Sequence, residues 1–192
     1  MIMKLKALFF SLLTCAAFGS PLIEAKAGYF FFTDSDLRKI YDKGGVDLQL
    51  TGVYPIYRYL HVYGSVEYLE KSGRSLGAHQ KTHVWEVPLS LGLQALFPLN
   101  ESSKYYISFG PRYFFIHSHN SSTYVPSKMD KNGIGFFANT GFLFILDEHI
   151  TVDVFGEYSY GKFSFHSSKP ETQGQKTQIG GVAVGAGLGY SF

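Results

Sequence analysis

The chain has 192 residues, with 17 Lys and Arg against 15 Asp and Glu, so its formal net charge is only +2. Mean hydropathy is close to zero, and no segment beyond the N-terminal region is apolar enough for a membrane helix, which needs about 20 residues. Cys15 is the single cysteine, so the sequence offers neither a disulfide nor a cysteine metal site.

The N-terminal segment has the pattern of an export signal. Lys4 and Lys6 precede an apolar run at 7–13, and Ala25-Lys26-Ala27 has the small-x-small form of a signal-peptidase site. We therefore expect residues 1–27 to be a cleaved signal peptide and the mature domain to span 28–192.

Alternation of apolar and polar residues predicts eight strands in the rest of the chain. In one of them Val46, Leu48 and Leu50 share a face opposite Asp47 and Gln49, as expected for a period of two. The segment at 133–146 is the least regular, because two large apolar residues fall on its polar face. The predicted strands are 28–33, 46–54, 59–69, 83–97, 104–117, 133–146, 150–165 and 182–192.

The C-terminal strand has the clearest pattern of the eight. Phe192, Tyr190 and Leu188 lie on an apolar face, whereas Gly189 and Gly187 belong to a face of small residues. An apolar outer face with small or polar residues on the inner face is typical of strands in a membrane barrel. The connections 55–58, 98–103 and 147–149 are short, and 34–43, 70–82, 119–132 and 166–178 are longer, which is also the arrangement in such barrels.

These features resemble the small outer-membrane β-barrel superfamily that includes the OmpA membrane domain, OmpX and OmpW. The resemblance implies an all-β fold, an eight-stranded antiparallel up-and-down transmembrane β-barrel in the bacterial outer membrane. It also implies that the terminal residues Leu188, Tyr190 and Phe192 are an assembly signal for the barrel-assembly machinery. A soluble periplasmic β-sandwich, which would bury the same apolar faces against each other, is the alternative.

Two prolines lie inside predicted strands. Pro88 and Pro111 lack the N–H group that a strand ladder needs. We therefore predict that the ladder is interrupted at both positions, and that a local bulge accommodates them.

The inner face of the predicted barrel carries more acidic than basic residues. Buried carboxylates require a partner or water. We therefore expect Arg112 at the centre of a hydrogen-bonded plug with Glu86 and one or more of Glu67, Asp153 and Glu157. An eight-stranded barrel is filled by its own side chains. A narrow path for cations is the alternative. The predicted lumen charge network is Asp47, Glu67, Glu86, Arg112, Asp153 and Glu157.

The longer connections carry an excess of positive charge. A cationic external rim suits the phosphates of lipopolysaccharide, and acidic surface glycans are the alternative partner. We expect a monomer with a structural or surface-interaction role, outer-membrane lipids around it and no nucleic-acid partner. The predicted rim consists of Lys71, Arg74, Lys81, Lys128, Lys131, Lys162, Lys169 and Lys176.

Histidines also gather near the predicted external ends of the strands. Such residues can bind zinc or change charge at mildly acid pH, but the sequence places no carboxylate to complete a metal site. His117, His119 and Ser121 superficially resemble the His-x-Ser-Asn signature of the lipid A deacylases, although the spacing differs. No acid is placed to orient the base. We expect no catalytic site, no cofactor and no metal, with the hydrolase kept as an alternative. The histidines concerned are His79, His83, His117, His119 and His166.

Overall fold

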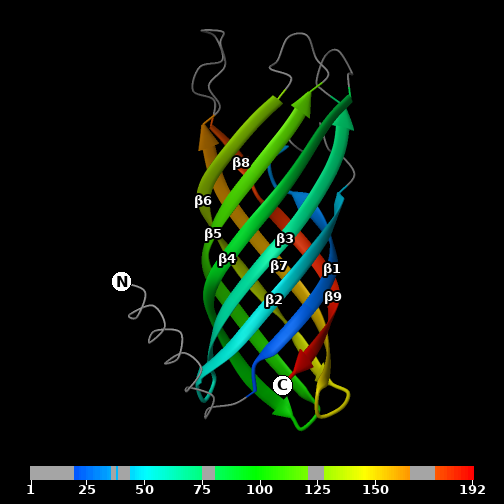
Figure 1. Ribbon diagram of the computed structural model, residues 1–192, viewed down its shortest axis with the longest axis vertical. Coiled ribbons are helices and arrows are strands. Elements are labelled where there is room, and N and C mark those ends of the chain that lie inside the picture. The colour runs from blue at the N-terminus through cyan, green and yellow to red at the C-terminus, as the bar shows by residue number, and fades with distance from the viewer. Residues whose placement is uncertain (1–19, 36–37, 39–43, 75–80, 121–127, 165–175) are drawn as a thin grey trace, which may run out of the picture.

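The fold is a closed barrel of antiparallel strands, seen from the side in Figure 1. The computed structural model describes residues 20–35, 38, 44–74, 81–120, 128–164 and 176–192. The strands are β1 (Leu22–Phe32), β2 (Gly45–Tyr57), β3 (Leu60–Arg74), β4 (Lys81–Asn100), β5 (Ser103–Asn120), β6 (Lys128–Ile145), β7 (Ile150–Ser164), β8 (Lys176–Ile179) and β9 (Gly181–Ser191).

The strands β1 to β7 each pair with their neighbours in sequence, and the circle closes through β9, which pairs with β7 on one side and with β1 on the other. β8 and β9 continue one another along β7, separated by Gly180, whose φ of 142° is a backbone conformation that favours glycine. The two therefore count as one position, and the predicted eight-stranded antiparallel barrel is confirmed. No α-helix within the described ranges is long and apolar enough to cross a bilayer.

The side chains of the barrel are arranged inside out relative to a soluble protein. On β2, Val46, Leu48 and Leu50 are 58, 50 and 56% exposed, whereas Asp47 and Gln49 are 2 and 4% exposed. A β-sandwich would bury such an apolar face. The sandwich alternative is therefore wrong for this chain.

The two ends of the barrel differ. Phe192 donates its backbone N–H to the carbonyl of Pro21 at 3.1 Å, and the short connections after β2, β4 and β6 lie at this same end, which we call the terminal end (Figure 1). The opposite end, where β1 finishes at Phe32, is the distal end. The longer connections leave from the distal end, and most of their residues lie outside the described ranges.

The first strand begins earlier than the sequence predicted. Residues 22–27, which we assigned to the signal peptide, pair with β2 on one side and β9 on the other. Lys26, inside the expected peptidase motif, pairs with Gln49 and Gly187 and is 3% exposed. The barrel therefore starts at Leu22 and not at Gly28.

The predicted interruptions are confirmed on one side of each proline; on the other side the ladder continues, with Pro88 opposite Phe114 and Pro111 opposite Phe136. The β3–β4 ladder lacks its pairs at Pro88, and the β4–β5 ladder lacks its pairs at Pro111. The register is the same on both sides of each gap, so no bulge accompanies them. The register shifts lie instead at the terminal end, between Pro55 and Tyr57 and between Pro98 and Asn100.

The position of β1 makes a prediction about processing of the chain. We expect the mature protein to retain Leu22–Ala27, because cleavage after Ala27 would leave the facing parts of β2 and β9 without hydrogen-bond partners on the side of β1. Intact-mass measurement of the protein purified from the envelope checks this. A mature N-terminus at Gly28 would contradict it.

Candidate functional site

A buried arginine joins opposite walls of the barrel. The guanidinium of Arg112, on β5, forms an ion pair with Glu157 on β7 at 2.7 Å and a second ion pair with Glu67 on β3. Its Nε also donates to Ser90 Oγ at 2.8 Å. Because β3 and β7 are diametrically opposed in the closed order of strands, these contacts cross the whole lumen.

Aromatic rings fill the space beside this arginine. The Phe137 ring centroid lies 5.2 Å from the guanidinium carbon of Arg112 and 5.1 Å from the centroid of Tyr63. Tyr63 and Phe137 are 0 and 1% exposed. The large residue that disturbed the alternation of the sixth predicted strand is thus part of the packing of the lumen.

A lysine makes a second connection across the barrel, closer to the terminal end. Lys26 Nζ on β1 lies 2.5 Å from Asp153 Oδ2 and 3.2 Å from Glu24 Oε2. It also donates to the Tyr106 hydroxyl on β5 at 3.3 Å, and that hydroxyl donates to Asp153 at 2.9 Å. Since β1 and β5 are also diametrically opposed, this group ties together the other pair of walls.

The small inner face of β9 makes room for this lysine. A Cβ atom at Gly187 would lie only 2.7 Å from Lys26 Cγ, so a larger side chain would displace the lysine stem. The small residues of the C-terminal strand therefore complement the long side chains that β1 and β7 send into the lumen.

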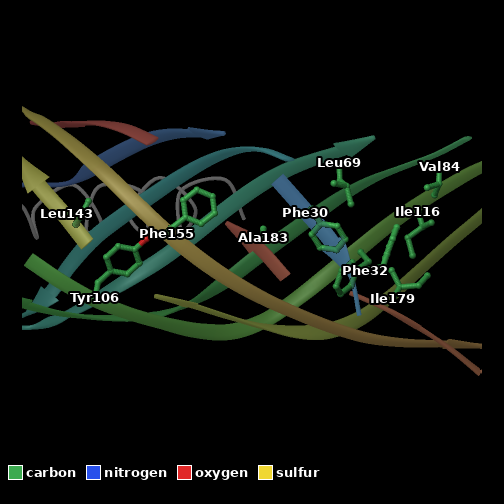
Figure 2. Packing of buried hydrophobic residues seen from close by; sticks show 11 residues of the cluster. Phe30, Phe32, Leu69, Val84, Tyr106, Ile116, Leu143, Phe155, Ile179 and Ala183 are labelled. Atoms are coloured by element: carbon green, nitrogen blue, oxygen red, sulfur yellow. The ribbon is translucent and has the colours of Figure 1, made fainter. Parts of the chain in front are cut away.

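Lys71 lies inside the barrel and not on the external rim where the sequence placed it. It is 3% exposed, and its ammonium donates to the carbonyl of Phe30 at 3.1 Å. The ammonium lies 4.2 Å from the Phe32 ring centroid. Figure 2 shows Phe30 and Phe32 close to Leu69 and Ile116 within the cluster of buried hydrophobic side chains. We call this group, near the distal end of β1, the distal layer.

The remaining two predicted lumen acids lie in this distal layer. The register pairs Leu69 with Asp47 on one side and with Glu86 on the other, and both carboxylates are buried. Asp47 accepts a hydrogen bond from Gln49 at 2.7 Å. The structure thus brings Arg112 together with Glu67 and Glu157, but distributes Asp47, Glu86 and Asp153 over other groups.

For the rest of the predicted rim, the structure gives backbone positions only. Arg74 and Lys81 are cross-strand partners at the distal ends of β3 and β4. Lys169 lies outside the described residues. The remaining rim residues lie at the distal ends of β6, β7 and β8: Lys128, Lys131, Lys162 and Lys176.

The histidines that the structure describes at the distal end lie on β4 and β5, and the hydrolase alternative concerns those on β5. The His117 ring lies 5.0 Å from Trp85, and His119 pairs with His83 in the ladder. Ser121, His79 and His166 lie outside the described residues. Within the described ranges, no group of three or more His, Cys, Asp or Glu residues is arranged to hold a metal ion.

The predicted assembly residues end the last strand at the outer surface. Leu188, Tyr190 and Phe192 are 64, 48 and 61% exposed, and the last two rings pack edge to face at 5.1 Å. Tyr190 also stacks on His149 of the neighbouring turn at 5.5 Å. The terminal aromatic residues are thus accessible on the outer wall at the terminal end.

The fold is shared with solved outer-membrane proteins. OprG from Pseudomonas aeruginosa has a TM-score of 0.67 and 18% identity over 91% of this chain and 96% of its own. Outer membrane protein W of E. coli has a TM-score of 0.62 and 13% identity, over 92 and 100% of the two chains. Ail of Yersinia pestis, in complex with the heparin analogue sucrose octasulfate, has a TM-score of 0.55 and 16% identity, over 91 and 99%. No protein-family model and no curated protein sequence matches the chain.

Sequence reasoning missed several lumen residues for identifiable reasons. Glu24 and Lys26 were read as part of the leader, although they continue the alternation of Gly28. Lys71 was read as part of a loop, although it continues the alternation of Glu67 and Leu69. In each case the usable signal was the alternation of inward and outward positions. This alternation continues past the last outward-facing apolar residue of the predicted strand.

The geometry around Arg112 predicts a large effect of its removal. We expect Arg112→Met to lower the free energy of unfolding by about 3–5 kcal/mol, because Glu67 and Glu157 would remain buried without their cation. The measurement is urea unfolding of the barrel in lipid vesicles.

Arg38→Met is the matched control, since Arg38 is exposed and its loss should change stability by less than about 0.5 kcal/mol. Adding Glu67→Gln and Glu157→Gln to Arg112→Met should recover part of the loss. If Arg112→Met and Arg38→Met unfold alike, the guanidinium does not hold the two walls together.

Proposed function

We propose that this chain is an integral protein of the bacterial outer membrane, exported by a signal peptide, inserted by the barrel-assembly machinery and acting as a monomer with a closed lumen. Its role is structural and surface-interactive, with lipopolysaccharide and outer-membrane lipids as its immediate partners. The observation that carries the proposal is that large apolar side chains cover the outer wall of the barrel, whereas charged side chains are buried inside it.

The outer wall supports membrane insertion. Exposed large apolar residues follow one another around the barrel, as in Leu91 at 62% and Phe109 at 64% exposed on β4 and β5. Such an apolar surface, combined with a polar interior, is stable only in contact with hydrocarbon. The described strands form a closed ring of ladders, as a membrane-spanning sheet requires.

The interior supports a closed lumen. The two connections across the barrel, through Arg112 and through Lys26, obstruct different levels of the lumen. Tyr63, Tyr106 and Phe137 are at most 1% exposed. Eight strands leave a lumen just wide enough to be filled by side chains, and these side chains fill it.

A closed lumen predicts no steady conductance. In planar bilayers we expect the unmodified barrel, shown to be folded by its heat-modifiable migration, to give no sustained current. Removing both connections, by Ala at Arg112, Phe137, Lys26 and Tyr106 together, should open a cation-preferring current, because most of the buried carboxylates stay in the lumen.

Arg38→Ala, outside the lumen, is the control and should stay silent. A steady cation current through the unmodified barrel would favour the narrow-pore alternative over the closed lumen.

Contact with acidic glycans is the second candidate function. The Ail barrel is recorded in complex with the heparin analogue sucrose octasulfate, and Arg74 and Lys81 of this chain stand opposite each other in the ladder at the distal end. Sulfate esters on a glycan would offer such paired cations a matching charge.

Glycan contact predicts salt-sensitive binding. Cells that display the protein should bind heparin-coated beads less well when salt rises from about 0.05 M to about 0.5 M, because screening shortens the reach of surface charges. Arg74→Gln with Lys81→Gln should weaken binding, whereas Arg58→Gln with Lys104→Gln, at the terminal end, should not. Salt-insensitive binding, or equal loss in both variants, would argue against this role.

The hydrolase alternative has less support. His117 packs against Trp85 on the outer wall. A base needs an acid that orients it and a nucleophile within hydrogen-bond reach. Because His117 is engaged in a ring contact with Trp85, we do not assign it a catalytic role.

A further inference from the structure

A cavity lies in the mouth of the lumen at the terminal end of the barrel. Its volume is about 520 Å³, within the range of small-molecule sites. The residues around it come from several different strands, and the walls are largely apolar: Leu22, Val53, Leu96, Leu143 and Ile145.

The charged residues at this cavity are all basic. Arg58 and Lys104 line it, and no Asp or Glu is among the described residues that do so. Arg58 is held in place by the Tyr59 ring, 5.0 Å from its guanidinium carbon. Lys104 pairs in the ladder with Leu143, which belongs to the apolar wall. Cation and hydrocarbon therefore lie side by side.

Polar groups at the cavity have unused hydrogen-bonding capacity. Gln94 is 2% exposed, lines the cavity and has no partner for its Oε1 atom among the described residues. The same holds for His61 Nδ1 and Thr151 Oγ1. His61 and Gln94 are cross-strand partners, so two of these groups are adjacent. Buried polar atoms are normally satisfied by a protein group, by water or by a bound molecule, so these atoms are available to hydrogen-bond to whatever occupies the cavity.

We propose that this cavity binds a small organic anion with an aliphatic body, of the class of medium-chain carboxylates. The carboxylate lies between Arg58 and Lys104, within reach of the polar groups at His61 and Gln94. The alkyl chain packs against Leu96 and the other apolar walls. The cavity is the terminal mouth of the lumen, so binding there does not depend on whether the lumen is closed farther along the axis.

Methyl NMR of the barrel in lipid nanodiscs tests the proposal, with sodium hexanoate as the probe. Methyl signals of Leu96, Leu143 and Ile145 should shift and saturate with hexanoate, and should shift much less with hexanol or hexylammonium at the same concentrations. Arg58→Gln with Lys104→Gln should weaken hexanoate binding by about fivefold or more.

Arg38→Gln is the matched control, since it removes one positive charge at an exposed site that does not line the cavity, and it should leave hexanoate binding unchanged. Equal shifts with hexanol would show that only the apolar walls matter, and would overturn an anion site. Absence of saturation, or unchanged binding in the double variant, would overturn it as well. Heat-modifiable migration of each variant shows that the barrel itself is intact, so loss of the site is distinguishable from loss of the fold.

Discussion

The ion pairs of Arg112 with Glu67 and Glu157 are the interaction on which the interior depends. A barrel whose outer wall is apolar must place its polar side chains inside, where charges are costly unless they are paired. One guanidinium can satisfy two carboxylates because its donors form a rigid planar fork. The pairing therefore joins walls that share no ladder hydrogen bonds.

The same logic explains why the strands differ so much in residue size. Long side chains such as Lys26 reach the lumen centre only if an adjacent strand presents small residues, as β9 does at Gly187. On β6 the balance is reversed, because Phe137 is large and packs against Arg112 and Tyr63. The strands therefore differ in the size of the side chains that they place in the lumen.

The sequence predicted which residues of each strand face outward, because an alternation of two is a local property. It did not predict where strands begin, since that depends on pairing with distant strands. Lys26 sits in a motif that is equally consistent with a peptidase site and with an inward-facing strand position. The sequence also did not predict which carboxylates contact Arg112, because strand tilt and register decide which inward side chains lie at the same height in the lumen. Asp153 instead meets Lys26, a residue that had been assigned to the leader.

The barrel is asymmetric along its axis. Among the buried residues described, six carboxylates share the interior with three cations, Lys26, Lys71 and Arg112. The lining of the terminal cavity contains basic side chains and no acidic ones among the described residues. Basic side chains thus lie at the terminal mouth and an excess of carboxylates lies deeper in the barrel. This distribution of charge favours an anion at the mouth and opposes its passage through the barrel.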